Sequence, residues 1–313
     1  MASETLARIA WGFMADPGDG LARALTQRHG IEAAAQLVES TTSPTRVLTG
    51  LSEEISPANY AQLERWRARY DPAQVQASHR KQRHAGIQVM GSEDPLWPTR
   101  MNDLGPAAPL TLWVRGDPGV VARGRAVLAV VGSRHPTGAG LAHTTAIVQG
   151  AWCEGVGIVS GGALGIDSIA HQASLVHGRV PIAVLAGGLE SVYPSDNVSL
   201  MTHIAERGAV FSEAPCGMRI RPERFLARNR LIAALSQALV VVEAAHRSGA
   251  INTAHHAAGL GRDIGVVPGR WEDTHARGCF RIVREQGAMV LTEPADVGFL
   301  LPGVPTHSPK LGP

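Results

Sequence analysis

Residues 126–138 read AVLAVVGSRHPTG, an apolar run followed directly by glycine, serine and arginine. A second unit of the same kind follows at 157–167, GIVSGGALGID. The apolar runs do not alternate with polar residues, which is typical of strands buried on both faces of a parallel sheet. The glycine-containing segments behind them predict turns that lead from each strand into a helix. These two units therefore predict the centre of an α/β domain.

The same pattern extends in both directions from this centre. Further apolar runs predict strands, and the stretches between them predict helices. We expect strands at 110–114, 126–131, 157–160, 181–186, 209–211, 238–242 and 263–267, and helices near 138–153, 166–178, 197–207, 226–237 and 249–260. Strands that alternate with helices form right-handed βαβ units, so we predict a doubly wound, mostly parallel sheet.

The beginning of the chain differs from this part, because it contains no β-branched runs. Residues 1–73 predict a small all-helical domain, with helices near 4–14, 20–29, 31–39 and 58–70. Residues 74–84 are polar and basic, and for them we favour a solvated linker over a DNA contact. The α/β domain is then expected at 85–300, with a proline-rich tail at 301–313.

Composition narrows the class of protein. The formal net charge of +2 does not predict a nucleic-acid partner, so any anion site needs local clustering of basic residues. Cys153, Cys216 and Cys279 lie far apart, which argues against a disulfide framework and a structural zinc site and fits a reducing compartment. Neither a leader pattern nor an apolar run of membrane-spanning length is present in the sequence. We expect a soluble, cytoplasmic protein.

Three turns rich in small residues follow predicted strands, at 132–138, 160–167 and 186–189, the last containing Gly187 and Gly188. Ligands of such sheets bind beyond the carboxyl ends of the strands. Gly132 lets backbone N–H groups face an anion, and Arg134 can form a forked contact to a phosphate. Glycine that merely permits a tight turn explains any single loop equally well. Three loops at one edge favour a shared groove that binds phosphate.

Several catalytic and cofactor classes are disfavoured. The turns contain neither a Walker A loop nor a GxGxxG fingerprint, which argues against ATP hydrolysis and NAD chemistry, and no cofactor is predicted. Asp167 and His171 have a spacing that suits a metal, but a third ligand is not evident, so a helix-capping aspartate and a packed or hydrogen-bonded histidine are favoured. Glu243 is a candidate general base, although we favour a carboxylate that orients a ligand or pairs with an arginine.

The strongest local charge lies at 219–230, RIRPERFLARNR, with five arginines and one phenylalanine. A run of charges often forms a solvated face. Arginine, however, suits forked phosphate contacts and stacking on bases, and a basic track with an aromatic platform is typical of proteins that hold single strands. Phe225 is the candidate for stacking, with an ordinary core phenylalanine as the alternative.

An ordered set of motifs resembles the DNA-processing protein A family (DprA, also called Smf) over roughly 85–300. The motifs are Gly132-Ser133-Arg134, Ser160-Gly161-Gly162-Ala163, Tyr193-Pro194, Ser212-Glu213, Phe225 with Arg228-Asn229-Arg230, Glu243 with Ser248-Gly249, and Pro268-Gly269. The resemblance implies an extended Rossmann-like fold that binds single-stranded DNA, dimerises, and loads the RecA recombinase during natural transformation. It also implies that residues 1–73 correspond to a sterile-alpha-motif or helix-hairpin-helix domain.

Site residues are implied by position within these motifs. Arg134, Phe225, Arg228, Asn229 and Arg230 would hold DNA, and the phosphate pocket would include Gly132, Ser133, Ser160, Gly161 and Gly162. Two departures concern the segment around Phe225. The family's Phe-Pro element is replaced by Phe225-Leu226-Ala227, and Arg221 or Arg224 would substitute for a lysine that often precedes the phenylalanine. We expect no room for a winged-helix domain after residue 300.

Two other classes remain open. Phosphoribohydrolases of the lysine-decarboxylase-like group share the fold, but their Pro-Gly-Gly-x-Gly-Thr-x-x-Glu loop is only partly matched by Pro268-Gly269-Arg270-Trp271. A module that senses nucleotides would use the same phosphate pocket for a mononucleotide. Binding that does not depend on oligonucleotide length would favour that class.

Overall fold

The computed structural model describes residues 2–40, 42–50, 56–122, 125–150 and 156–301. Its centre is one nine-stranded sheet in the order β1-β2-β6-β5-β4-β3-β7-β8-β9. From β6 to β9 neighbouring strands are parallel, and β1 and β2 are antiparallel additions at one edge. The strands are β1 (Gln88–Met90), β2 (Leu112–Gly116), β3 (Val127–Val131), β4 (Gly157–Ser160), β5 (Val180–Leu185), β6 (Ala209–Ser212), β7 (Ala238–Val241), β8 (Asp263–Val266) and β9 (Met289–Val290).

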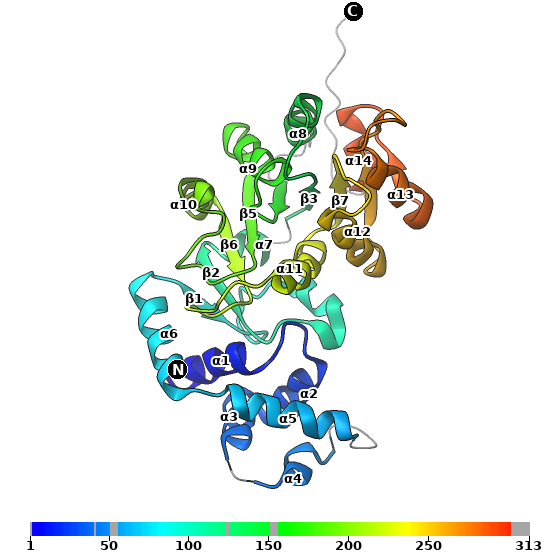
Figure 1. Cartoon of the computed structure of the whole chain (residues 1–313). Coiled ribbons are helices and arrows are strands. Elements are labelled where there is room, and N and C mark those ends of the chain that lie inside the picture. Colours follow the sequence, from blue (N-terminus) through cyan, green and yellow to red (C-terminus); the bar gives the residue numbers. More distant parts are fainter. Residues whose placement is uncertain (1, 41, 51–55, 123–124, 151–155, 302–313) are drawn as a thin grey trace, which may run out of the picture.

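Helices cover both faces of the sheet (Figure 1). In β3, Val127, Ala129 and Val131 belong to the hydrophobic cluster that contains α11 and α12. Leu128 and Val130 belong to the cluster that contains α8 and α9. Alternate side chains of a strand point to opposite faces, so a strand with a helix on each side must be apolar throughout. The helices are α7 (Gly119–Ala122), α8 (Gly138–Gly150), α9 (Ile166–Val176), α10 (Val198–Arg207), α11 (Pro222–Leu235), α12 (Gly249–Gly259), α13 (Arg277–Gln286) and α14 (Val297–Leu300).

This architecture confirms the predicted α/β class and the mostly parallel sheet. Every predicted strand is present, as β2 to β8, with ends shifted by at most a few residues. The sequence did not predict β1 and β9, nor α13 and the short helices α4 (Pro44–Leu48), α7 and α14. The two missed strands have only three and two residues, which is too short for a pattern of hydrophobicity to emerge.

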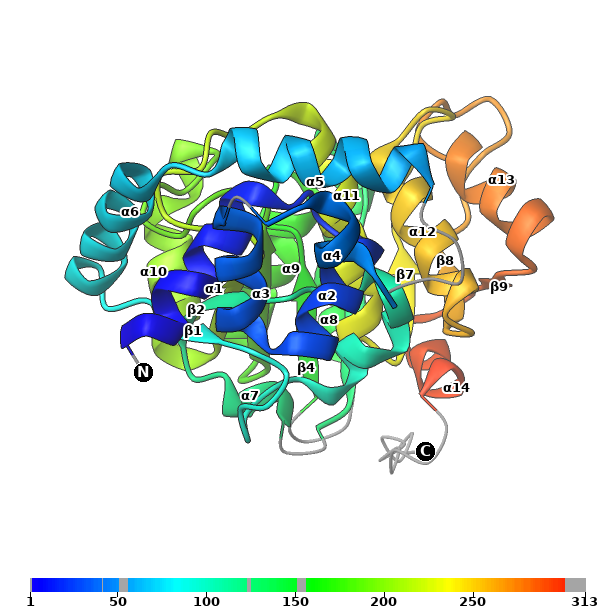
Figure 2. The same cartoon turned by 90° about the horizontal axis from the view of Figure 1, so that it is seen from below.

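The helices of the N-terminal part gather at one end of the molecule, next to β1 and β2 (Figure 1), and Figure 2 views the molecule from their side. They are α1 (Ala2–Met14), α2 (Gly20–His29), α3 (Ile31–Glu39), α4 (Pro44–Leu48), α5 (Pro57–Arg69) and α6 (Pro72–His84). Trp11 and Leu25 share a hydrophobic cluster with Trp113 of β2. A Cβ on Gly12 of α1 would lie 2.8 Å from the Trp113 ring, so glycine permits this close contact. The helices therefore pack directly on the sheet, and the division of the chain into domains stays a prediction.

The segment 74–84, which was expected to be a solvated linker, is most of helix α6. Asp71 caps the helix by accepting a hydrogen bond from the Ala73 N–H, and Pro72 occupies the first turn. Val75, Ser78 and Gln82 are buried at helical spacing, while the basic side chains lie on the remaining surface. Only one of the three buried residues is apolar, which hid the helical period in the sequence.

No helix in the described part of the chain is long and apolar enough to cross a membrane. Cys216 and Cys279 are buried free thiols, and Cys153 lies outside the described residues. Of the tail predicted at 301–313, residues 302–313 also lie outside them, whereas Leu301 is buried.

Candidate nucleic-acid interface

A cleft of about 370 Å³ opens at the carboxyl ends of β3, β4 and β7. The chain runs from β3 to β4 on one side of β3, and later returns to β7 on the other side. Doubly wound sheets bind ligands at such a switch point, because the loops of neighbouring strands diverge there. The lining residues come from the three loops and from α11, namely Gly132, Ser133, Arg134, Ala163, Asp167, Phe225, Leu226, Arg228, Asn229, Arg247, Ser248 and Gly249, with apolar neighbours beneath.

The loop that carries Arg134 is held in place by Glu243 at the end of β7. The Thr137 N–H donates to the carboxylate at 3.0 Å and the Thr137 hydroxyl donates to it at 2.5 Å. A Cβ on Gly140 would lie 2.5 Å from the Glu243 carboxyl carbon. Helix α8 can therefore come this close to Glu243 only because residue 140 is glycine. Glu243 faces His275 at 3.8 Å rather than an arginine. Of the two roles expected for Glu243, the arginine pair is not found among the described residues, where the carboxylate orients the loop, and the orientation of a ligand stays a prediction.

The loops after β3 and β4 touch each other. The Ile166 N–H donates to the Ser133 carbonyl at 3.1 Å. Gly165 has φ of +82°, and a Cβ there would lie 2.4 Å from the same carbonyl oxygen. Only glycine meets both conditions without strain. This contact fixes the distance between the two loops and keeps the cleft open between them and α11.

A basic and aromatic group stands at the mouth of the cleft. The exposed Arg134 guanidinium lies 5.6 Å from the centre of the Phe225 ring, and the Tyr193 ring meets Phe225 edge-on at 5.8 Å. Phe225 is half-buried and belongs to none of the hydrophobic core clusters of the described residues. The alternative of an ordinary core phenylalanine is therefore disfavoured. Tyr193 is 57% exposed and was not predicted as a site residue, although its motif was noted.

The floor of the cleft contains a buried arginine. Arg228 donates to the Gly161 carbonyl at 2.5 Å and also to the Val184 carbonyl. Burial lowers the pKa of Arg228 to about 10, an effect that the nearby Asp167 charge opposes. Burial raises the pKa of Asp167, and the Arg228 charge opposes that shift. Burial, with the Arg228 charge as a second cause, also lowers the pKa of His171 to about 3.

Asn229 connects α11 to the start of α12 at one wall of the cleft. Its side-chain amide donates to the Asn252 side chain at 3.1 Å and to the Gly249 carbonyl at 3.3 Å. The Ser248 hydroxyl caps α12 by accepting a hydrogen bond from the Ala250 N–H at 3.2 Å. Asn229 therefore positions the start of α12 beside the cleft.

Three of the arginines predicted to bind DNA lie elsewhere. Arg230 pairs with Glu213 at 2.6 Å and donates to the Ala107 carbonyl at 3.0 Å, with only 6% of its side chain exposed. Arg221 and Arg224 line a different cavity on the side of the N-terminal helices. The segment 219–230 therefore does not form one continuous basic track along the cleft.

The predicted phosphate pocket is also divided. Gly132 and Ser133 line the cleft, but the Ser160 hydroxyl is buried and donates to the Val130 carbonyl at 2.7 Å. Gly161 lies behind Arg228, whose guanidinium would be 2.6 Å from a Cβ there. The remaining predicted glycines pack within the fold: Gly162 lies against Leu185 and Met201, Gly187 against Ile220, and Gly188 against Glu190 and Pro215.

The prediction that three loops share one groove is therefore wrong for the third loop, 186–189. Ile220 lies so close to Gly187 that a Cβ there would be 2.6 Å away, and the segment after β6 covers this loop. In contrast, Arg247 lines the cleft and is exposed, although the sequence analysis did not select it. Its only signal was its position shortly after the end of β7.

Metal binding gains no support from side-chain clusters. No group of three or more His, Cys, Asp or Glu side chains suited to a metal occurs among the described residues. Asp167 accepts a hydrogen bond from the Ala163 N–H at 3.3 Å, while Gly165 occupies the cap position of α9. His171 is fully buried, so a packed histidine is the better description.

Comparisons with known proteins agree on one family. The sequence model described as DNA recombination-mediator protein A matches residues 88–301. The DNA processing protein DprA of Bacillus subtilis is 32% identical over 228 residues, which are 73% of this chain and 75% of that protein. A putative DNA processing protein DprA of Mycobacterium tuberculosis is 42% identical over 190 residues, 61% of this chain but only 49% of that protein. The chain therefore matches about half the length of this last relative.

Two solved structures are similar over most of their lengths. The X-ray structure of DprA from Streptococcus pneumoniae has a TM-score of 0.76 and 27% identity, and the match covers 96% of this chain and 98% of that one. A structure of DprA from Helicobacter pylori, which concerns the binding of single-stranded DNA by that protein, has a TM-score of 0.60 and 28% identity. That match covers 67% of this chain and 94% of the other.

Proposed function

The chain belongs to the DNA recombination-mediator protein A family (DprA, or Smf), and we propose that it binds single-stranded DNA in the cleft at the carboxyl ends of β3, β4 and β7. One observation carries this proposal. Arg134, a group suited to phosphate, and Phe225, a group suited to stacking on a base, lie 5.6 Å apart at the mouth of the cleft. The H. pylori relative, whose structure concerns single-stranded DNA, supports it.

The cleft offers both kinds of contact that a single strand needs. Exposed Arg134 and Arg247 on two of its loops would bind phosphates, together with backbone N–H groups near Gly132. Phe225 and Tyr193 would hold bases by stacking, which does not depend on sequence. Arg228 adds a fixed positive charge beneath the strand. We therefore expect binding that is salt-sensitive and tolerant of base sequence.

We propose further that the protein acts by binding and not as an enzyme, and that it loads the RecA recombinase during natural transformation. This step would take place in the cytoplasm, and membership of the family supports it. We also propose a homodimer. In its support, two large apolar side chains in the C-terminal part of the described chain are exposed: Trp271, in the loop between β8 and α13, is 85% exposed, and Phe299 of α14 is 75% exposed. Sedimentation at micromolar concentration should give the mass of a dimer, and a monomer there would contradict this part of the proposal.

The first test is fluorescence anisotropy of a labelled oligothymidine, titrated with the protein at several salt concentrations beside the matching duplex. We expect tight, salt-sensitive binding of the single strand and much weaker binding of the duplex. A lack of binding at low salt, or equal affinity for a mononucleotide, would overturn the proposal.

The Arg134→Ala variant tests the site itself. We expect weaker binding to all sequences alike and a salt slope reduced by about one, because one phosphate contact is lost. The matched control is Arg207→Ala, which removes an exposed arginine from the end of α10, at the opposite edge of the sheet. Equal affinity of the two variants would remove Arg134 from the site.

A further inference from the structure

A second cavity, of about 640 Å³, lies between the N-terminal helices and the segment that leads into α11. We call it the helix-side groove. One wall contains Phe13 from the end of α1, Asp16 from the turn that follows it, Arg69 from α5 and Gln74 from α6. The other wall is formed by residues 217–219, 221, 223–224 and 227. The groove is larger than the cleft, and both parts of the chain contribute to it.

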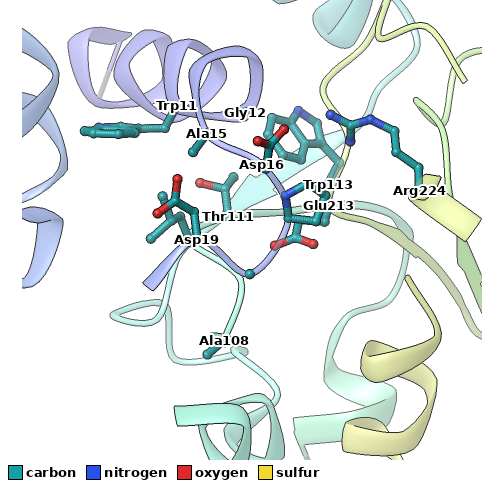
Figure 3. A pocket seen from close by; sticks show the side chains of 13 residues that line it. Trp11, Gly12, Ala15, Asp16, Asp19, Ala108, Thr111, Trp113, Glu213 and Arg224 are labelled. Carbon is teal, nitrogen blue, oxygen red and sulfur yellow. The ribbon is translucent and has the colours of Figure 1, made fainter. Parts of the chain in front are cut away.

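The inner part of this groove is electrically balanced. Arg69 pairs with Asp16 at 2.9 Å, and its guanidinium also donates to the Met14 carbonyl at 3.1 Å. Arg224 extends from α11 toward Asp16 and Glu213 (Figure 3). Burial lowers the pKa of Arg224, and the charges of Glu213 and Asp16 oppose that shift. These two arginines therefore already face carboxylates within the fold.

The outer part carries positive charge that the fold does not use. Arg219 and Arg221 are exposed, and neither guanidinium forms a hydrogen bond or ion pair with any residue that the structure describes. Lys81 of α6 reaches the same rim, since its ammonium group would lie 3.5 Å from a Cβ on Gly217. Three cations from two parts of the chain thus border one opening, together with the exposed carboxylate of Glu223. The cations outnumber this carboxylate and can bind an anionic ligand.

The helix-side groove and the cleft lie on two sides of the same helical turn. Phe225 and Leu226 line the cleft, whereas Arg224 and Ala227 line the groove. The distance along α11 between these positions is less than one turn, which is about 5.4 Å. A strand that leaves the cleft past Phe225 would reach the groove by crossing the exposed Leu226 side chain.

We propose that the helix-side groove is a second subsite for the backbone of the same DNA strand, with helices α5 and α6 as its outer wall. The inference rests on the proposed function of the cleft and extends it to the N-terminal helices. Arginine and lysine at the opening suit phosphates, while the phenylalanine in the groove, Phe13, is buried and offers no stacking surface. The groove would therefore hold the sugar-phosphate backbone without recognising bases. It would do so only for a strand that is long enough to extend beyond the cleft.

The test compares a short and a long oligothymidine, dT6 and dT20, by fluorescence anisotropy of the full chain. The variant is the double substitution Lys81→Ala with Arg219→Ala. We expect about tenfold weaker binding of dT20 with a salt slope reduced by about two, and unchanged affinity for dT6. The control, Arg207→Ala with Arg284→Ala, removes the same charge from the ends of α10 and α13. Both double variants should melt at the wild-type temperature, because all four side chains are exposed.

Equal dT20 affinity of the two double variants would overturn the second subsite. An equal loss on dT6 and dT20 would also overturn it, because the two cations would then belong to the cleft. If the variant binds dT20 normally but loses affinity for a polyglutamate peptide, the groove takes an acidic protein segment instead. Failure of the wild-type protein to bind either oligonucleotide is a different result, which removes the proposed function of the cleft.

Discussion

The two ends of the arginine-rich segment 219–230 each carry two arginines but lie in opposite environments. Arg219 and Arg221 are exposed and unpaired among the described residues, whereas Arg228 and Arg230 are 7% and 5% exposed and bound to carbonyl or carboxylate oxygens. The difference arises from α11, which begins at Pro222 and is buried at every residue from 228 to 235. An arginine is thus a structural residue where the fold supplies its acceptors, and a candidate ligand-binding residue where it does not.

The largest effect on stability is expected from a substitution at the buried end of this segment. Arg230→Ala removes the ion pair with Glu213, whose side chain is only 15% exposed and then keeps only the charge of Arg224 nearby; breaking a buried pair typically costs about 3–5 kcal/mol of stability. The free energy of unfolding can be measured by urea denaturation. Arg219→Ala is the matched control at the exposed end, where we expect a change within about 0.5 kcal/mol. Similar losses of stability in the two variants would show that the two ends do not differ in this way.

Acid should also lower the stability of the fold through His171 of α9, which lies near the buried Arg228. The pKa of His171 is lowered from 6.5 to about 3 by burial and by the Arg228 charge, so between these pH values the unfolded chain binds the additional proton. The stabilisation is complete above pH 6.5 and is lost as the pH falls toward 3, by about 2 kcal/mol between pH 6.5 and 5. His171→Leu should flatten the dependence of the melting temperature on pH in this range. An unchanged slope would assign the acid sensitivity to other groups.

A substitution of Phe225, which lies between the two ends, should have the smallest effect on stability and a clear effect on DNA binding. Phe225→Ala should weaken the binding of single-stranded DNA by about 1–3 kcal/mol, because a stacking surface is lost. Its melting temperature should change little, since Phe225 is half-buried and lies outside the core clusters. Phe280→Ala on α13 is a control of the same residue type. Normal binding with a lowered melting temperature would place Phe225 in the core instead.

Local sequence was sufficient for most of the α/β fold. The strands could be predicted because a strand with helices on both faces must be apolar throughout, as in Val127–Val131. The loop with Arg134 could be located because it follows such a strand. Helix α6 was missed because Ser78 and Gln82 supply most of its buried face, and polar side chains do not mark a hydrophobic period.

Side-chain direction, in contrast, was decided by the tertiary structure. Arg228 and Arg230 are two residues apart on one helix, so they point about 200° away from each other around its axis. One therefore lies under the cleft and the other meets Glu213 near Ala107. The amino-acid sequence determined which residue types stand at the carboxyl edge of the sheet. The packing of α11 against the sheet, α12 and the segment 99–107 decided which of them remain free to bind, because each buried arginine must satisfy its donors within the fold.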